Sequence, residues 1–150
     1  MKRMVTVVLI ISVALSGILA VSCQSPPPAP GPTTEERLAR VYDRFFEGLI
    51  LDGARTHTVV TGDMLSLLSR QYYDNGFFYP VIMLASRDVV VDPDYILPGM
   101  ELTIPDLQRN LDNPQARANI KEFLLEIAVI EDGRNRPLDA AGLRALSESL

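Results

Sequence analysis

The sequence predicts an α+β protein, in which a strand–helix–helix–strand module over residues 56–106 has helices on both sides. Two short runs, at 56–60 and 101–104, are rich in Thr, Val, Leu and Ile, which is typical of strands. Between them, apolar residues recur at helical spacing in two segments separated by a Gly-containing turn. The same spacing outside the module predicts an N-terminal amphipathic helix over 33–53 and a C-terminal helical extension over 107–150, both packed against the module.

The N-terminal helix begins with a capping box. Thr33 stands three residues before Glu36, so each side chain can accept a hydrogen bond from the other residue's backbone N–H. Gly53 is expected to end the helix. Its apolar residues form one stripe, made of Leu38, Val41, Tyr42, Phe45, Phe46, Leu49 and Ile50. This stripe is too apolar to face water, so it either packs on the module or binds a protein partner.

Turn residues divide the module into its elements. Gly62 follows the first strand and permits the positive φ of a tight turn, and Asp63 is expected to cap the next helix. The second helix is expected over 77–86, with Pro80 in its first turn, where a missing N–H costs little. A loop with two prolines then returns the chain to the second strand.

The C-terminal extension contains two helical segments. Asn113 and Pro114 are typical of a helix start, and Gly133 of the end of that helix. Pro137 is expected to interrupt the chain, and Asp139 to cap a last short helix.

The N-terminal segment has the order of an export signal. A basic start, a long apolar run and small residues precede Cys23, which predicts a signal peptide over 1–22. Cys23 begins a Pro-rich linker over 23–32, and its position resembles that in a bacterial lipoprotein signal, although Ala20 stands where Leu is usual. In such signals the cysteine is lipidated and becomes the new N-terminus. The protein is then exported and lipid-anchored to a bacterial membrane of the cell envelope, facing the periplasm or the cell wall.

Two other interpretations of this segment remain open. An apolar run of this length can just cross a bilayer of about 30 Å, so the segment can also serve as an uncleaved membrane anchor. Simple secretion is the third interpretation.

Composition and charge exclude several function classes. The net charge is −5 and there is no basic stripe, so nucleic acid is not an expected partner. One cysteine and one histidine provide neither an internal disulfide nor a zinc site.

His57 is interpreted as a structural residue, and Asp92 and Asp94 as turn residues rather than a glycosidase pair. No catalytic residue, cofactor or metal is predicted, and the protein is not expected to be an enzyme.

The order of the module and the residues at its turns resemble the LysM domain. The resemblance rests on segments 57–63, 70–82 and 92–105, which follow the family's order and spacing and cover about a third of the chain. The middle segment resembles the longer LysM variant. That variant occurs in small bacterial envelope proteins and in potassium-binding proteins that join a BON domain to LysM, but no BON-like segment is evident in this chain.

The resemblance implies a shallow groove between two loops, which binds N-acetylglucosamine units of peptidoglycan or chitin. Family members use backbone hydrogen bonds and apolar contact with the sugar face. Carried over to this sequence, the groove is lined by Gly62, Asp63, Met64 and Leu65 from one loop and by Asp94, Tyr95 and Ile96 from the other. Met64 stands where the family commonly has Thr, Ser66 where an aromatic residue is frequent, and Ser86 where Asn is common. Because of these departures, the alternative remains open that the LysM module has only a structural role and binds no glycan.

Two function hypotheses follow. In the first, the protein is a non-catalytic, membrane-anchored lipoprotein that binds peptidoglycan. In the second, the LysM module is a structural core and the helices at 33–52 and 113–132 bind an envelope protein partner. Sedimentation with purified cell-wall sacculi distinguishes the two, because only the first predicts binding to the wall.

Overall fold

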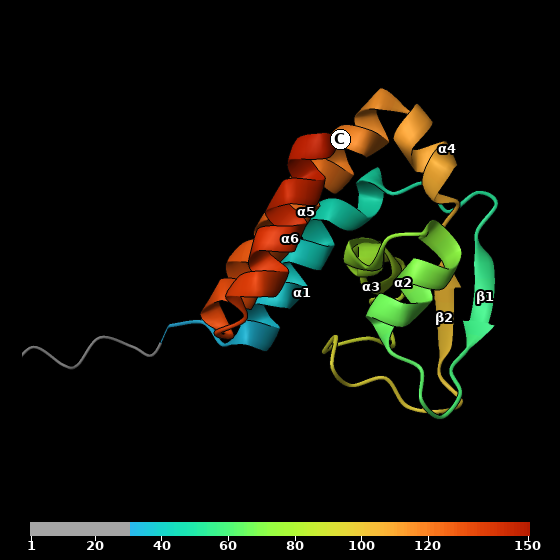
Figure 1. The fold of residues 1–150 in the computed structure, drawn as a ribbon, viewed down its shortest axis with the longest axis horizontal. Coiled ribbons are helices and arrows are strands. Elements are labelled where there is room, and N and C mark those ends of the chain that lie inside the picture. The colour runs from blue at the N-terminus through green and yellow to red at the C-terminus, as the bar shows by residue number, and fades with distance from the viewer. Residues whose placement is uncertain (1–30) are drawn as a thin grey trace, which may run out of the picture. The chain divides into compact units, whose positions relative to one another are not determined.

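The computed structural model describes residues 31–150 (Figure 1). The predicted signal peptide over 1–22, Cys23 and most of the linker lie outside the described residues. Within residues 31–150, no helix combines the length and the apolar character needed to cross a membrane. The elements are, in order, α1 (Thr34–Phe45), η1 (Phe46–Gly48), β1 (Arg55–Thr58), α2 (Leu65–Tyr73), η2 (Gly76–Phe78), α3 (Tyr79–Ala85), β2 (Glu101–Ile104), α4 (Leu107–Asp112), α5 (Pro114–Gly133) and α6 (Pro137–Ser149), where η denotes a 3₁₀ turn.

The strands β1 and β2 pair antiparallel, with His57 opposite Leu102 and Thr58 opposite Glu101. Side chains alternate between the two faces of a strand, and Leu102 and Ile104 are the β2 residues that face the core. The helices α2 and α3 lie between the strands in the sequence, and α3 contacts β2. The predicted α+β class and the strand–helix–helix–strand order are therefore confirmed.

Three helices outside the module, α1, α5 and α6, lie side by side (Figure 1). The ring of Phe123 on α5 is fully buried, and its centroid lies 5.6 Å from that of Phe45 and 6.3 Å from that of Tyr42, both on α1. The helix α3 contacts α5 as well as β2, so one hydrophobic core joins the module to the flanking helices. The apolar stripe of α1 thus packs inside the protein, which confirms the packing interpretation over a partner-binding helix.

The N-terminal helix is shorter than predicted. Its capping box is present, but α1 ends at Phe45 and a 3₁₀ turn carries the chain only to Gly48. Where α1 ends, Asn119 Nδ2 donates a hydrogen bond to Phe45 O at 2.8 Å. Further on, the buried amide of Asn110 accepts a hydrogen bond from Ile50 N and donates one to Ile50 O, which holds that residue out of a helix. Gly53 instead lies in the turn before β1, with a φ of +81°.

Two features of the C-terminal extension differ from the prediction. The short helix α4 was not predicted; it begins where Asp106 accepts a hydrogen bond from Arg109 N. Pro137 stands at the predicted break, since α5 ends at Gly133 and Pro137 is the first residue of α6, where a proline lacks only an N–H that would have no helical partner. Asp139 therefore lies within the first turn of α6 and does not cap it.

We predict that Gly142→Ala destabilises the protein. At an open site inside a helix this change gains about 1 kcal/mol, but a Cβ at Gly142 in α6 would lie 2.2 Å from the Phe77 ring. Moving that ring is expected to lower the free energy of unfolding by about 1–3 kcal/mol in urea titrations. Gly133→Ala is the control, because its Cβ meets nothing closer than Arg37 Nη1 at 3.9 Å. A gain in stability from Gly142→Ala would contradict the prediction.

Candidate functional site

The two loops predicted to face each other do so across a cavity of about 290 Å³ that is open to solvent. Five of the seven predicted groove residues line it, namely Asp63, Met64, Leu65, Asp94 and Ile96. Gly62 and Tyr95 do not. The remaining walls are made by Ser66, Tyr79, Pro93, Arg136 and Asp139. The last two belong to the C-terminal extension, so the groove has a wall from outside the strand–helix–helix–strand module. We call this cavity the groove.

The first loop is shaped by a tight turn and by Asp63. Gly62 has a φ of +97°, which permits the bond from Asp63 N to Val60 O at 3.1 Å. The Asp63 carboxylate accepts a hydrogen bond from Val60 N at 2.9 Å and lies 2.8 Å from His57 Nε2. The hydrogen bond with His57 is the main reason that the pKa of Asp63 lies below its usual value.

The prediction that Asp63 caps the next helix is wrong. Met64 occupies the N-cap position of α2, and its side chain makes no capping bond. Asp63 is instead committed to the turn and to His57, whose Nδ1 lies 3.0 Å from the Tyr72 hydroxyl. Truncation of Asp63 would therefore loosen the loop rather than uncap the helix.

The apolar residues of the groove differ in exposure. Met64 is 52% exposed and lines the open groove, whereas Leu65 is 3% exposed and packs in the core. Ile96 is partly buried against the core and lines the groove. Tyr95 is 66% exposed outside the groove. Among the predicted residues, Met64 and Ile96 are therefore the ones that offer apolar side-chain surface inside the groove.

The second loop is held by the connection between α5 and α6. Arg134 Nη2 donates to Asp92 Oδ1 at 2.8 Å and to Asp94 Oδ2 at 2.9 Å. Arg136 also bonds to both oxygens of Asp94. Asp92 Oδ1 accepts a further hydrogen bond from Asp94 N, which shapes the turn itself. The carboxylate of Asp94 therefore fixes the loop, while the residue also lines the groove; its predicted contact with a ligand stays a prediction.

A buried carboxylate completes this ionic cluster. Glu131 is 1% exposed, with Oε1 at 3.6 Å from Arg134 Nη1 and Oε2 at 3.5 Å from Arg136 Nη1. Its burial raises its pKa above the usual value, against the effect of the two arginines. The sequence did not reveal the cluster, because the aspartates and arginines lie about 40 positions apart and no local pattern links them.

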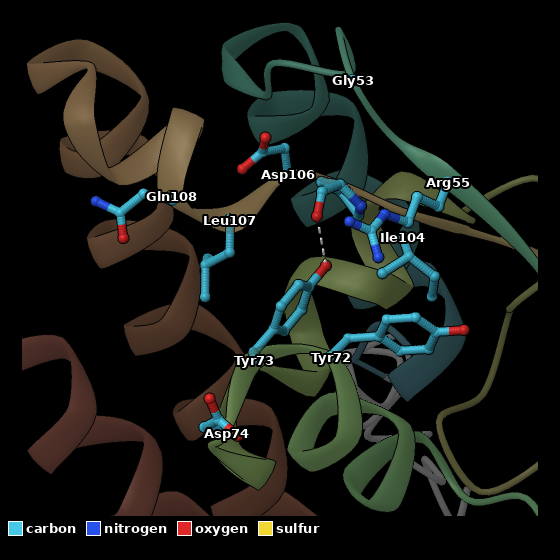
Figure 2. A pocket seen from close by; sticks show the side chains of 10 residues that line it. Gly53, Arg55, Tyr72, Tyr73, Asp74, Ile104, Asp106, Leu107 and Gln108 are labelled. Carbon is cyan, nitrogen blue, oxygen red and sulfur yellow. Dashed lines mark hydrogen bonds between the residues drawn. The ribbon is translucent and has the colours of Figure 1, made fainter.

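A separate cavity of about 310 Å³ lies between the end of α2 and the start of α4 (Figure 2). Tyr72 and Tyr73 reach into it from α2, and Leu107 reaches into it from α4. The Tyr73 hydroxyl donates a hydrogen bond to the Pro105 carbonyl at 3.0 Å, which closes one side. None of the predicted glycan-binding residues lines this cavity, so it is distinct from the groove.

The residues considered for catalysis are engaged in structural bonds. Both ring nitrogens of His57 have partners, Asp63 and Tyr72. Asp92 and Asp94 are paired with arginines of the α5–α6 connection. Among residues 31–150, no three His, Cys, Asp or Glu side chains are grouped so that they could hold a metal ion.

Comparison with known proteins finds one relevant similarity. A segment of 69 residues, 46% of this chain, is 35% identical to the potassium binding protein Kbp of Escherichia coli O6:H1. The aligned segment spans 46% of that protein, so this chain covers about half the length of the curated relative it matches. No protein-family model matches the chain, and no solved structure does.

Proposed function

We propose that the groove binds a glycan containing N-acetylglucosamine, such as peptidoglycan, within a LysM-type module. The observation that carries the proposal is the cavity itself, since the two loops selected by resemblance lie on opposite sides of one groove open to solvent. Met64 and Ile96 offer apolar surface for a sugar face. The partial match to Kbp supports a binding protein, although the name of that relative gives potassium and not a glycan as its ligand.

We further propose that the whole chain is a lipoprotein of the bacterial cell envelope, anchored through acylated Cys23. A short, open groove offers few contacts, and affinities from millimolar to micromolar correspond to only about −4 to −8 kcal/mol. Anchoring near the wall compensates by raising the local concentration of the binding module. The Pro-rich linker would then act as a semi-rigid spacer of up to about 3 Å per residue.

Sedimentation with purified sacculi tests the proposal. Residues 31–150 form a compact unit of their own and are suitable for the assay. We expect this fragment to sediment with sacculi and to be released by soluble chitin oligosaccharides. A fragment that stays in the supernatant at millimolar wall sugar would refute glycan binding.

Two substitutions in the groove are expected to change glycan affinity in opposite directions. Ile96→Ala should weaken binding about fivefold, since it removes about 1 kcal/mol of apolar contact. Met64→Thr restores a hydroxyl that the LysM family commonly has and should strengthen binding. NMR titration with chitin oligosaccharides measures both. Val91→Ala is the control, because Val91 is 57% exposed and lies outside the groove. If the three variants and the wild type bind the oligosaccharide with equal affinity, the glycan binds outside the groove.

The second candidate function is binding of a protein partner through the flanking helices. The stripe of α1 is buried, but Leu125 and Val129, one turn apart on α5, are 41% and 47% exposed. This face is the surface that such a partner would use. The sacculus experiment separates this candidate from the first, because a scaffold of this kind has no affinity for the wall.

The match to Kbp makes binding of potassium ions a third candidate. Titration of residues 31–150 with potassium chloride, with sodium chloride as the matched control, tests it. Amide shifts specific to potassium would favour this candidate, and identical shifts with the two salts would remove it.

A further inference from the structure

Three buried polar atoms have no hydrogen-bond partner within residues 31–150, namely the Tyr42 hydroxyl, Glu131 Oε2 and Arg134 Nη1. Tyr42 is 5% exposed and Glu131 is 1% exposed. The three side chains come from α1, α5 and the α5–α6 connection, which meet behind the second loop of the groove. A buried polar group without a partner costs free energy, and ordered water usually satisfies it where no other side chain does.

The Arg134 guanidinium lies at the centre of this group. Its Nη2 is bonded to Asp92 and Asp94, but its Nη1 lies 3.6 Å from Glu131 Oε1, beyond the reach of a hydrogen bond. Arg136 Nη1 lies 3.5 Å from Glu131 Oε2 and makes no hydrogen bond with it. The buried carboxylate is therefore in electrostatic contact with both arginines but is not directly bonded to either, a separation that water commonly bridges.

Tyr42 approaches the same guanidinium from α1. The adjacent Asp43 pairs with Arg87 at 3.2 Å, so this part of α1 lies along the segment that leads to Asp92. Burial raises the pKa of the Tyr42 phenol well above its usual value, and the charges of Asp92 and Arg134 act on it in opposite directions. The hydroxyl therefore stays protonated within electrostatic range of Arg134, where it can both donate and accept a hydrogen bond.

We propose that one internal water molecule bridges Tyr42, Arg134 and Glu131. The water accepts a hydrogen bond from Arg134 Nη1, donates one to Glu131 Oε2 and shares a third with the Tyr42 hydroxyl, and about three bonds are typical of a buried water. A neutral dipole suits this position, because the arginines disfavour a cation and the carboxylates disfavour an anion. Since Arg134 also holds Asp92 and Asp94, the water connects α1 to the loop that forms one side of the groove.

A high-resolution crystal structure of residues 31–150 tests this site directly. We expect an electron-density peak about 2.7–3.2 Å from each of Tyr42 Oη, Arg134 Nη1 and Glu131 Oε2. Crystals grown in rubidium chloride distinguish water from a monovalent cation, because a bound rubidium ion gives an anomalous signal and water does not. The proposal would be overturned by the absence of a peak, by a peak that does not contact all three atoms, or by an anomalous signal at that position.

Tyr42→Phe is a test in solution whose sign depends on the water. Removal of a hydroxyl that has no partner would raise the melting temperature or leave it unchanged, whereas removal of one that binds the water should lower it by about 3–6 °C. The amide resonances around Asp94 should also broaden, although Tyr42 does not line the groove. Tyr95→Phe is the control, because Tyr95 is 66% exposed. An unchanged or higher melting temperature for Tyr42→Phe would contradict the proposal, and neither outcome depends on glycan binding.

Discussion

A fragment of residues 55–106 is expected to be largely unfolded, although it contains both strands and both module helices. The core of the protein is shared, because α3 contacts α5 and the rings of Tyr42 and Phe45 on α1 pack on Phe123 of α5. Burial of each large apolar side chain contributes about 1.5–3 kcal/mol. Loss of several such contacts removes more free energy than the 5–15 kcal/mol by which a typical domain is stable against unfolding.

Circular dichroism and thermal melting of the fragment, beside residues 31–150, measure this effect. We expect a cooperative transition for the longer chain and none for the fragment. A fragment that melts cooperatively at the same temperature would show that the module is an independent domain and that the flanking helices contribute little to its stability.

Arg134→Ala is expected to lower the free energy of unfolding by about 3 kcal/mol, since it removes one of the two arginines that compensate the buried carboxylate of Glu131. The Arg134 side chain is 15% exposed and contacts Asp92, Asp94 and the buried carboxylate of Glu131. This expected loss lies at the low end of the range for broken buried ion pairs. The reason is that Arg136 Nη1 remains 3.5 Å from Glu131 Oε2 and still compensates part of its charge. The loop that forms one side of the groove should also become mobile, which broadens the amide resonances around Asp94.

Arg144→Ala is the matched control for this substitution. Arg144 on α6 pairs with Asp132, but the two side chains are 41% and 45% exposed. Surface pairs of this kind contribute about 0–1 kcal/mol. Urea titrations should therefore show a clearly larger loss of unfolding free energy for Arg134→Ala than for Arg144→Ala. Equal losses of stability would show that the Arg134 cluster contributes no more than a surface pair.

Much of the groove could be predicted from the sequence because its parts are local. Gly62 permits a turn that few other residues adopt, and the turn residues around Asp92 and Asp94 mark a loop by their chemistry. Five of the seven side chains that the LysM resemblance assigned to the groove line one cavity. The role of Asp63 was predicted wrongly, because an acid before a helix is normally its cap, whereas here His57 and Val60 N compete successfully for the same carboxylate.

The sequence by itself determined the α+β class, the strand–helix–helix–strand order of the module and the turns of its two loops, since hydrophobic periodicity and turn residues act over a few positions. Only the tertiary structure decided what lies around those loops. It placed Arg134 and Arg136 on the second loop, Tyr79 and Asp139 in the wall of the groove, and Phe77 against Gly142. Each of these contacts joins residues distant in the chain, and their free energies depend on burial and mutual distance, which local sequence patterns do not encode.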